Sequence, residues 1–181
     1  RRSSSAASDV YKRQLLDEIK PELENINVFK AVFDKEYVRR LEGDWVKTGS
    51  SKMDLAEQVI DDIKAFNEKN NISSNVMIWC GSTEIYFEPS DVHSSIEKFE
   101  EGLRNDSPDI SPSMIYAYAA IKLGIPYANG APNLSADIPA LIELAEATKT
   151  PIAGKDFKTG QTLMKTILAP GLKACLLYTS P

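Results

Sequence analysis

Histidine and cysteine are scarce in this chain of 181 residues, which has one histidine and two cysteines. Cys80 is the last residue of an apolar run that we expect to form a buried strand, and Cys175 begins the last seven residues, so the two support neither a disulfide framework nor a zinc site. His93 has nothing nearby in the sequence to activate it, so we expect no catalytic set of the Ser-His-Asp or Cys-His type. These absences favour a reducing compartment, the cytoplasm, as the location of the protein.

Basic stripes and long apolar runs are also missing. The net charge is −5, and residues 1–14 contribute +3 to it, so the remainder of the chain carries −8. An acidic body argues against nucleic acid and anionic membrane as partners. No apolar run approaches the roughly 18–20 residues that a membrane-spanning helix needs. We therefore expect a globular domain that binds neither nucleic acid nor membrane.

The two ends of the chain differ in composition from what lies between them. Residues 1–14 are rich in serine and arginine, and they contain no apolar segment of the roughly 7–15 residues that a signal peptide requires. Residues 175–181 interrupt a helical pattern. Both ends resemble translated sequencing-adapter DNA. We therefore expect non-native tails at 1–14 and 175–181, and between them a genuine segment, 15–174, that is truncated at both ends.

Apolar segments of two kinds alternate along the chain. Residues 76–80 form an unbroken apolar run, which is typical of a strand buried on both faces in a parallel sheet. Elsewhere apolar residues recur at helical spacing after N-cap signals, as at Ser111-Pro112. The expected strands span 76–80, 125–129 and 152–153, and the expected helices span 51–70, 91–104, 112–123 and 160–173, with a further helix starting at Asp137 and Pro139. This alternation predicts an α/β fold with a doubly wound parallel sheet and flanking helices.

The apolar positions of these helices predict their buried faces. The positions expected to face the core are Leu55, Val59, Ile63, Phe66, Val92, Ile96, Phe99, Leu103, Ile115, Tyr118, Ala119, Leu141, Leu144 and Ala145.

Polar turns follow the three expected strands, at residues 80–84, 129–133 and 154–162. Ligands bind outside the carboxyl ends of the strands in sheets of this kind. A single site formed by all three turns is therefore the natural hypothesis.

The third turn has the strongest chemical signal. Gly154 and Gly160 allow tight backbone geometry, and an expected helix N-terminus at Thr159-Gly160 favours a phosphate group. Lys158 and Thr162 would add a cation and a second hydroxyl at the same place. The alternative interpretation is an ordinary strand-to-helix loop with suitable caps.

Several residues of these turns have a structural interpretation beside the functional one. Thr83 and Glu84 either meet a ligand or act as caps at the surface. Asn129 either adopts a left-handed turn conformation or contacts a ligand with its amide. Asp156 lies between two lysines, so it either belongs to a solvated charge cluster or faces the anion-binding turn.

Four motifs are distinctive when taken together and in order. They are Trp79-Cys-Gly-Ser-Thr-Glu-Ile-Tyr86, Ile110-Ser-Pro-Ser-Met-Ile-Tyr-Ala-Tyr-Ala-Ala120, Ile125-Pro-Tyr-Ala-Asn-Gly130 and Gly154-Lys-Asp-Phe-Lys-Thr-Gly-Gln-Thr162. In this combination the sequence resembles the myo-inositol-1-phosphate synthase family, and the likeness covers essentially all of residues 15–174.

The resemblance implies the central part of an NAD-binding, Rossmann-like domain from an inositol-3-phosphate synthase. Members of that family are NAD-dependent isomerases that convert D-glucose 6-phosphate to 1L-myo-inositol 1-phosphate, a step of inositol and phospholipid biosynthesis. The reaction proceeds by oxidation, enolisation, intramolecular aldol closure and re-reduction. The resemblance further implies a homotetramer for the complete enzyme.

The resemblance also implies which residues surround NAD. They are Cys80, Gly81, Ser82, Thr83, Asn129, Gly130, Asp156, Lys158, Thr159 and Thr162. The family's Gly-rich turn and catalytic lysines are expected outside residues 15–174, so no catalytic residue is assigned and the chain alone is expected to be inactive. Lys155 stands where the family often has an acidic residue, which leaves any metal ligand unassigned.

Two other functions remain open at this point. Another NAD-dependent oxidoreductase of the same fold would accumulate NADH with a hydroxy substrate. A non-catalytic dinucleotide-binding module would retain the fold without the chemistry.

Overall fold

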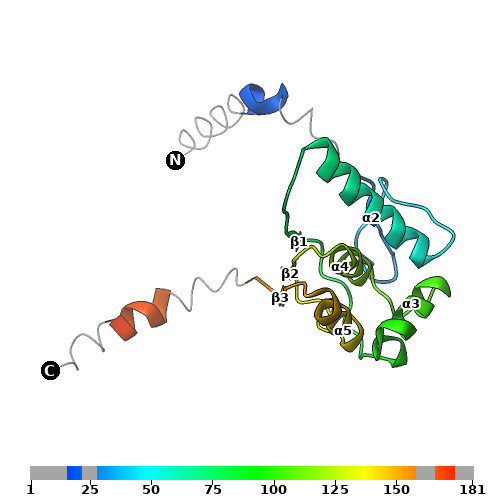
Figure 1. Cartoon of the computed structure of the whole chain (residues 1–181). Helices are drawn as coiled ribbons and strands as arrows, with labels where there is room; N and C mark the ends of the chain where they lie inside the picture. Colours follow the sequence, from blue (N-terminus) through cyan, green and yellow to red (C-terminus); the bar gives the residue numbers. More distant parts are fainter. Residues whose placement is uncertain (1–15, 22–27, 158–165, 174–181) are drawn as a thin grey trace. The chain divides into compact units, whose positions relative to one another are not determined.

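The computed structural model describes residues 16–21, 28–157 and 166–173, and the chain divides into two compact units, residues 1–31 and 32–181. Residues 16–21 of the first unit are helical, as are residues 166–173 of the second. The remaining elements all belong to the second unit (Figure 1). They are α2 (Lys52–Lys69), β1 (Met77–Trp79), the 3-10 helix η1 (Asp91–His93), α3 (Ile96–Arg104), α4 (Pro112–Lys122), β2 (Tyr127–Asn129), α5 (Pro139–Thr148) and β3 (Ile152–Gly154).

Serine residues are the N-caps of three helices: α2, α3 and α4. Ser51 accepts a hydrogen bond from the Asp54 N–H at the start of α2, and Ser111 accepts one from Met114 at the start of α4, where proline occupies the first turn. Gly124, with φ of +69°, follows the end of α4. These boundaries confirm the predicted helices at 51–70 and 112–123.

Two predicted helix starts are wrong. The helix expected at 91–104 is divided into η1 and α3. Ser95 takes an extended conformation between them, and its side chain caps α3 by accepting a hydrogen bond from the Lys98 N–H. Helix α5 has Ile138, not Asp137, as its N-cap residue. The Asp137 carboxylate instead accepts a hydrogen bond from the Ser135 N–H at 2.9 Å.

The three strands form a parallel sheet in the order β1-β2-β3. The chain passes from β1 to β2 through η1, α3 and α4, and from β2 to β3 through α5. These helical crossovers between parallel strands confirm the predicted α/β fold.

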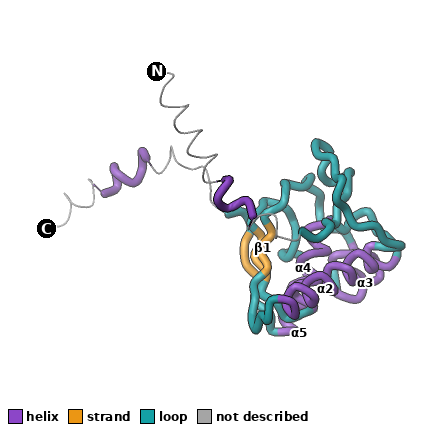
Figure 2. Tube along the Cα trace, turned by 90° about the horizontal axis from the view of Figure 1, so that it is seen from above, coloured by secondary structure: helices purple, strands orange, loops and turns teal. Residues whose placement is uncertain are grey.

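Helices α2 to α5 gather on one side of the sheet (Figures 1 and 2). On that side Tyr127 is 1% exposed and Asn129 is 2% exposed, whereas on the opposite face Ile78 is 55% exposed. The prediction of a first strand buried on both faces is therefore wrong, and Cys80, expected in a buried strand, is exposed. The physical reason is the alternation of side chains along a strand, which gives the helices only every second residue to cover.

Helix α4 is the centre of the core, with nine of its eleven residues buried. It packs against α2, α5 and the strands β1 and β2, and these contacts on several faces explain why it is mostly apolar. The largest fully buried apolar side chains of the core are Tyr127, Phe99, Leu103, Ile110, Met114, Ile115, Ile121, Ile138 and Leu141.

Most of the predicted inward positions are buried or partly buried, including Val59, Phe99, Ile115 and Leu141. Phe66 is an error, since it is 46% exposed. The residues of α2 that pack against the core lie between positions 53 and 63, and Phe66 follows that packed stretch. Among the residues that the structure describes, no helix has the length and apolarity needed to cross a membrane.

Candidate functional site at the carboxyl end of the sheet

The carboxyl ends of the three strands lie side by side. Trp79, Asn129 and Gly154 are the last residues of their strands, and they are paired in register. The turn after β2 then donates a backbone hydrogen bond from Gly130 to the Trp79 carbonyl oxygen at 2.9 Å. The structure thus brings the turn at 80–84 and the turn at 129–133 to one edge.

The segment after β3 joins the same edge as far as residue 157. The Asp156 N–H donates to the Ala131 carbonyl oxygen at 3.0 Å, and the Phe157 N–H donates to the Gly130 carbonyl oxygen at 3.1 Å. Lys158, Thr159 and Thr162 lie outside the described residues. The described part of the third turn is therefore fixed to the second turn by backbone hydrogen bonds.

Two glycines make this close approach possible. A Cβ at Gly154 would lie 2.2 Å from the Asn129 carbonyl oxygen, and the φ of Gly154 is +96°, a value that other residues rarely adopt. A Cβ at Gly130 would lie 2.7 Å from the Trp79 carbonyl oxygen. Side chains at these positions would force the turns apart, so the edge depends on both glycines.

Asn129 uses its side chain inside the turn. Its Oδ1 accepts a hydrogen bond from the Ala131 N–H at 3.0 Å, and its Nδ2 donates to the Asn133 carbonyl oxygen at 2.9 Å. Asn129 is not among the described residues with positive φ, so the left-handed interpretation is wrong. Both the oxygen and the nitrogen of the amide thus form hydrogen bonds within the turn, so the Asn129 side chain stabilises the conformation of the turn.

Asp156 is exposed and has a φ of +63°. The neighbouring Lys155 directs its ammonium to Asp137, with 2.9 Å between Nζ and Oδ2. Lys155 therefore does not form the local charge cluster with Asp156 that the sequence suggested. Asp156 lies two residues after the end of β3, next to the second turn.

The turn after β1 presents exposed polar groups. Cys80, Ser82 and Thr83 are exposed, and a Cβ at Gly81 would lie 2.5 Å from the Trp79 ring. Hydroxyl groups at the carboxyl end of a parallel strand are suitable donors for ribose or phosphate oxygens. The backbone of this turn lies so close to the Trp79 ring that a side chain at position 81 would collide with it.

Glu84 is the main polar residue whose role the sequence did not reveal. It is 5% exposed, and its carboxylate accepts hydrogen bonds from the Ser113 N–H at 2.9 Å and from the Ser113 hydroxyl at 2.5 Å. Its own N–H donates to Oδ1 of Asn133 at 2.9 Å. Burial raises the pKa of Glu84, and the hydrogen bonds from Ser113 oppose that shift.

These bonds join the first turn, the second turn and the N-terminus of α4 through one residue, with the Glu84 N–H bonded to Asn133 and its carboxylate bonded to Ser113. Twenty-nine positions separate Glu84 from Ser113, so no local pattern in the sequence could have indicated the contact. The predicted surface cap is therefore wrong: Glu84 caps α4, but it does so in the interior.

His93 is fully buried, and both ring nitrogens have partners. Nδ1 accepts a hydrogen bond from the Ser90 N–H, and Nε2 lies 2.9 Å from the Asp109 carbonyl oxygen. The described residues contain no group of three or more histidine, cysteine or acidic side chains suited to hold a metal ion.

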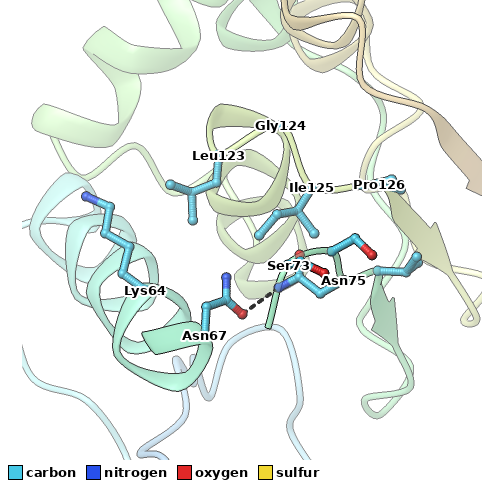
Figure 3. A pocket seen from close by; sticks show the side chains of 10 residues that line it. Lys64, Asn67, Ser73, Asn75, Leu123, Gly124, Ile125 and Pro126 are labelled. Atoms are coloured by element: carbon cyan, nitrogen blue, oxygen red, sulfur yellow. Dashed lines mark hydrogen bonds between the residues drawn. The ribbon is translucent and has the colours of Figure 1, made fainter. Parts of the chain in front are cut away.

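A separate cavity of about 720 Å³ lies at the opposite, amino end of the sheet (Figure 3). It is lined by residues of α2, of the loop before β1 and of the segment between α4 and β2, among them Lys64, Asn67, Asn75 and Leu123. None of the turns described above contributes to it.

Comparison with known proteins gives a consistent result. A family model described as "Myo-inositol-1-phosphate synthase", whose short name designates an NAD-binding domain, matches residues 2–178. The inositol-3-phosphate synthase 1 of Bacteroides thetaiotaomicron is 43% identical over 171 residues, which are 94% of this chain and 40% of that protein. The inositol-3-phosphate synthase of Brassica napus is 34% identical over 160 residues, covering 85% of this chain and 31% of the relative.

A solved structure agrees with these matches. The crystal structure of inositol-3-phosphate synthase from Caenorhabditis elegans superimposes with a TM-score of 0.79 at 28% identity, over 90% of this chain and 32% of that one. The chain thus spans less than half the length of these relatives.

Proposed function

This chain belongs to the myo-inositol-1-phosphate synthase family, and we propose that it forms the NAD-binding part of an enzyme that converts D-glucose 6-phosphate to 1L-myo-inositol 1-phosphate. The observation that supports this most is the edge formed by Trp79, Asn129 and Gly154, where glycines let the turns approach one another closely. An edge of this kind is where parallel α/β sheets bind dinucleotides.

The proposed NAD contacts come from all three turns, and the donor groups that they offer suit a dinucleotide. They are Cys80, Gly81, Ser82 and Thr83 of the first turn, Asn129 and Gly130 of the second, and Asp156, Lys158, Thr159 and Thr162 of the third. The exposed hydroxyls of Ser82 and Thr83 would donate to ribose or phosphate oxygens. Asn129 acts indirectly, because its amide holds the turn that carries Gly130.

The isomerisation sets a requirement for the cofactor site. Bound NAD would supply a hydride acceptor that is regenerated within one turnover, so the reaction would be redox-neutral overall. The turns must therefore keep one cofactor in place through several steps and exclude water from it. Backbone hydrogen bonds of 2.9–3.1 Å between the turns supply a rigid floor for that purpose.

The further features of the complete enzyme are proposed on the family relationship. They are a cytoplasmic location, assembly as a homotetramer, and catalytic lysines contributed by family segments other than the described turns.

Asp156 provides the first test. We expect Asp156→Asn to weaken NAD binding about tenfold, as loss of one charged hydrogen bond would, because asparagine tolerates the positive φ and removes only the charge. Isothermal titration with NAD measures the change. The matched control is Asp61→Asn, an exposed aspartate on α2, which should leave the affinity unchanged.

Equal affinities of the two variants would contradict the assignment of Asp156. Failure of the unaltered protein to bind NAD at millimolar concentration would contradict the proposed function itself. Net accumulation of NADH with a hydroxy substrate would indicate another oxidoreductase of the same fold.

A further inference from the structure

One carboxylate connects the loop after β2 with the segment after β3. It belongs to Asp137, two residues before α5, and its two oxygens have different partners. Oδ1 accepts a hydrogen bond from the Ser135 N–H at 2.9 Å, and Oδ2 lies 2.9 Å from the Lys155 ammonium. Ser135 lies in the loop from β2 to α5, and Lys155 is the first residue after β3. The Asp137 carboxylate therefore ties that loop to the third turn.

The residue after Lys155 has an unfavourable backbone conformation. Asp156 has a φ of +63°, and its side chain makes the left-handed region costly. Such a conformation persists where the surrounding contacts determine it. On one side, the N–H groups of Asp156 and Phe157 donate to carbonyl oxygens of the second turn at 3.0 and 3.1 Å. On the other side, the ion pair of Lys155 with Asp137 fixes the chain directly before Asp156.

We infer that the ion pair between Lys155 and Asp137 positions Asp156 for the cofactor. The inference rests on the proposed function, because Asp156 is one of the proposed NAD contacts. Lys155 is a positioning residue that acts through Asp156, since its own ammonium is already paired.

The exposure of the pair separates this role from a general stabilising one. The two side chains are 43% and 37% exposed, and ion pairs of that exposure contribute little to the stability of a whole domain. The effect of this pair is therefore local, on the backbone that carries the Asp156 carboxylate.

The test compares two lysines of similar exposure, each replaced in the full chain. Lys155→Met removes the ammonium and keeps a long side chain. Lys98→Met is the matched control: Lys98 is 47% exposed and pairs with Asp91 at 2.6 Å, on α3 and η1, which do not form the carboxyl edge. Lys155→Arg retains the charge. Isothermal titration with NAD and urea unfolding are measured for all three variants.

We expect Lys155→Met to bind NAD about three- to fivefold more weakly, the range that loss of a half-exposed ion pair produces. The difference should shrink at high salt, and Lys155→Arg should restore most of the affinity. Lys98→Met should bind NAD as the unaltered protein does, while both methionine variants lose similarly little stability in urea. A merely structural role of Lys155 would not produce this split.

A double variant tests whether Lys155 acts through Asp156. If it does, adding Lys155→Met to Asp156→Asn should weaken NAD binding little beyond the loss in Asp156→Asn alone. A full additional loss in the double variant would overturn the positioning role, because Lys155 would then act independently of the Asp156 carboxylate.

Unchanged NAD affinity in Lys155→Met, or an equal loss in Lys98→Met, would also overturn the inference and leave the proposed function standing. If the unaltered protein does not bind NAD, the proposed function fails, and amide hydrogen exchange then decides whether the ion pair holds the turn. Faster exchange at Asp156 and Phe157 in Lys155→Met than in Lys98→Met would support that role. Equal exchange rates would overturn it.

Discussion

The two ends of the sheet are built in different ways. At the carboxyl end the turns are tied together by backbone hydrogen bonds, by two glycines and by the buried side chains of Asn129 and Glu84. At the amino end, residues of α2, of the loop before β1 and of the segment between α4 and β2 line a cavity of about 720 Å³ (Figure 3). There a side-chain hydrogen bond of 2.8 Å, from Asn75 to Asn67, links the loop to α2.

The proposed dinucleotide site does not coincide with this cavity. A dinucleotide site in a parallel sheet needs backbone groups held at fixed positions, and tight turns provide them. The amino end has the larger space but offers one cation, Lys64, among amides, hydroxyls and apolar groups. Substitutions at the two ends should therefore have unequal effects.

The largest effect is expected from Gly154→Ala. The new Cβ would lie 2.2 Å from the Asn129 carbonyl oxygen at a φ of +96°, so the third turn must separate from β2. We expect a loss of about 4 kcal/mol in the free energy of unfolding, which is in the range of severe backbone and packing defects. Urea unfolding followed by circular dichroism measures it.

Gly124→Ala is the matched control for this prediction. Gly124 also has a positive φ, +69°, but a Cβ there would meet nothing within 4 Å. The expected loss is about 1–2 kcal/mol, the cost of the left-handed conformation alone. Equal losses in the two variants would show that the close approach of the turns does not matter.

A smaller but still large effect is expected from Glu84→Ala. The substitution leaves the N–H and the hydroxyl of Ser113 buried without their acceptor. We expect a loss of about 2–3 kcal/mol in the free energy of unfolding. Glu88→Ala removes an exposed carboxylate that accepts one bond from the Tyr86 hydroxyl, and it should cost about 0.5 kcal/mol or less.

The pH dependence of stability tests the same residue. Burial raises the pKa of Glu84 in the folded chain above its ordinary value of 4.5. Between these two pKa values the folded chain binds more protons than the unfolded chain, so the contribution of Glu84 to stability is full below pH 4.5 and is lost as the pH rises through the folded pKa.

Glu84→Gln has no titrating proton and should lack this part of the pH dependence. The difference in stability, unaltered protein minus variant, should therefore decrease as the pH rises above about 4.5. Thermal melts at a series of pH values measure it. Parallel curves for the two proteins would contradict a raised pKa.

The smallest effect is expected at the amino end. Asn67→Ala removes the partly buried hydrogen bond to Asn75 and should cost about 1 kcal/mol or less. NAD affinity should not change, because Asn67 lies at the opposite end of the strands from the proposed site. Lys64→Ala, in the same cavity, is the control for general effects of substitution there. A loss of NAD affinity in the Asn67 variant would remove the distinction between the two ends.

Local signals predicted most of the helix boundaries. Ser51, Ser111-Pro112 and Gly124 act on backbone groups within a few positions, so their effect can be deduced from neighbouring residues. The division of 91–104 was missed because the conformation of Ser95 depends on what surrounds it: the Ile96 N–H donates to the Glu143 carboxylate of α5.

The candidate site was predicted in part. The three polar turns were placed at strand ends because the alternation of strands and helices predicts parallel strands, whose ends meet at one edge. The partner of each side chain was not predictable. Lys155 pairs with Asp137, Asn129 bonds within its own turn, and Arg39 and Arg40 lie beside Ser82 in the folded chain.

The amino-acid sequence by itself determined the order of helices and strands, most of the helix boundaries and the family to which the chain belongs, because these depend on local backbone preferences and on motif order. The tertiary structure alone decided that one face of the sheet is covered, that Glu84 is buried against Ser113, and that two arginines line the first turn. Those features arise from contacts between different elements, such as the bond between Glu84 and Ser113 across 29 positions, and such contacts exist only once the chain has folded.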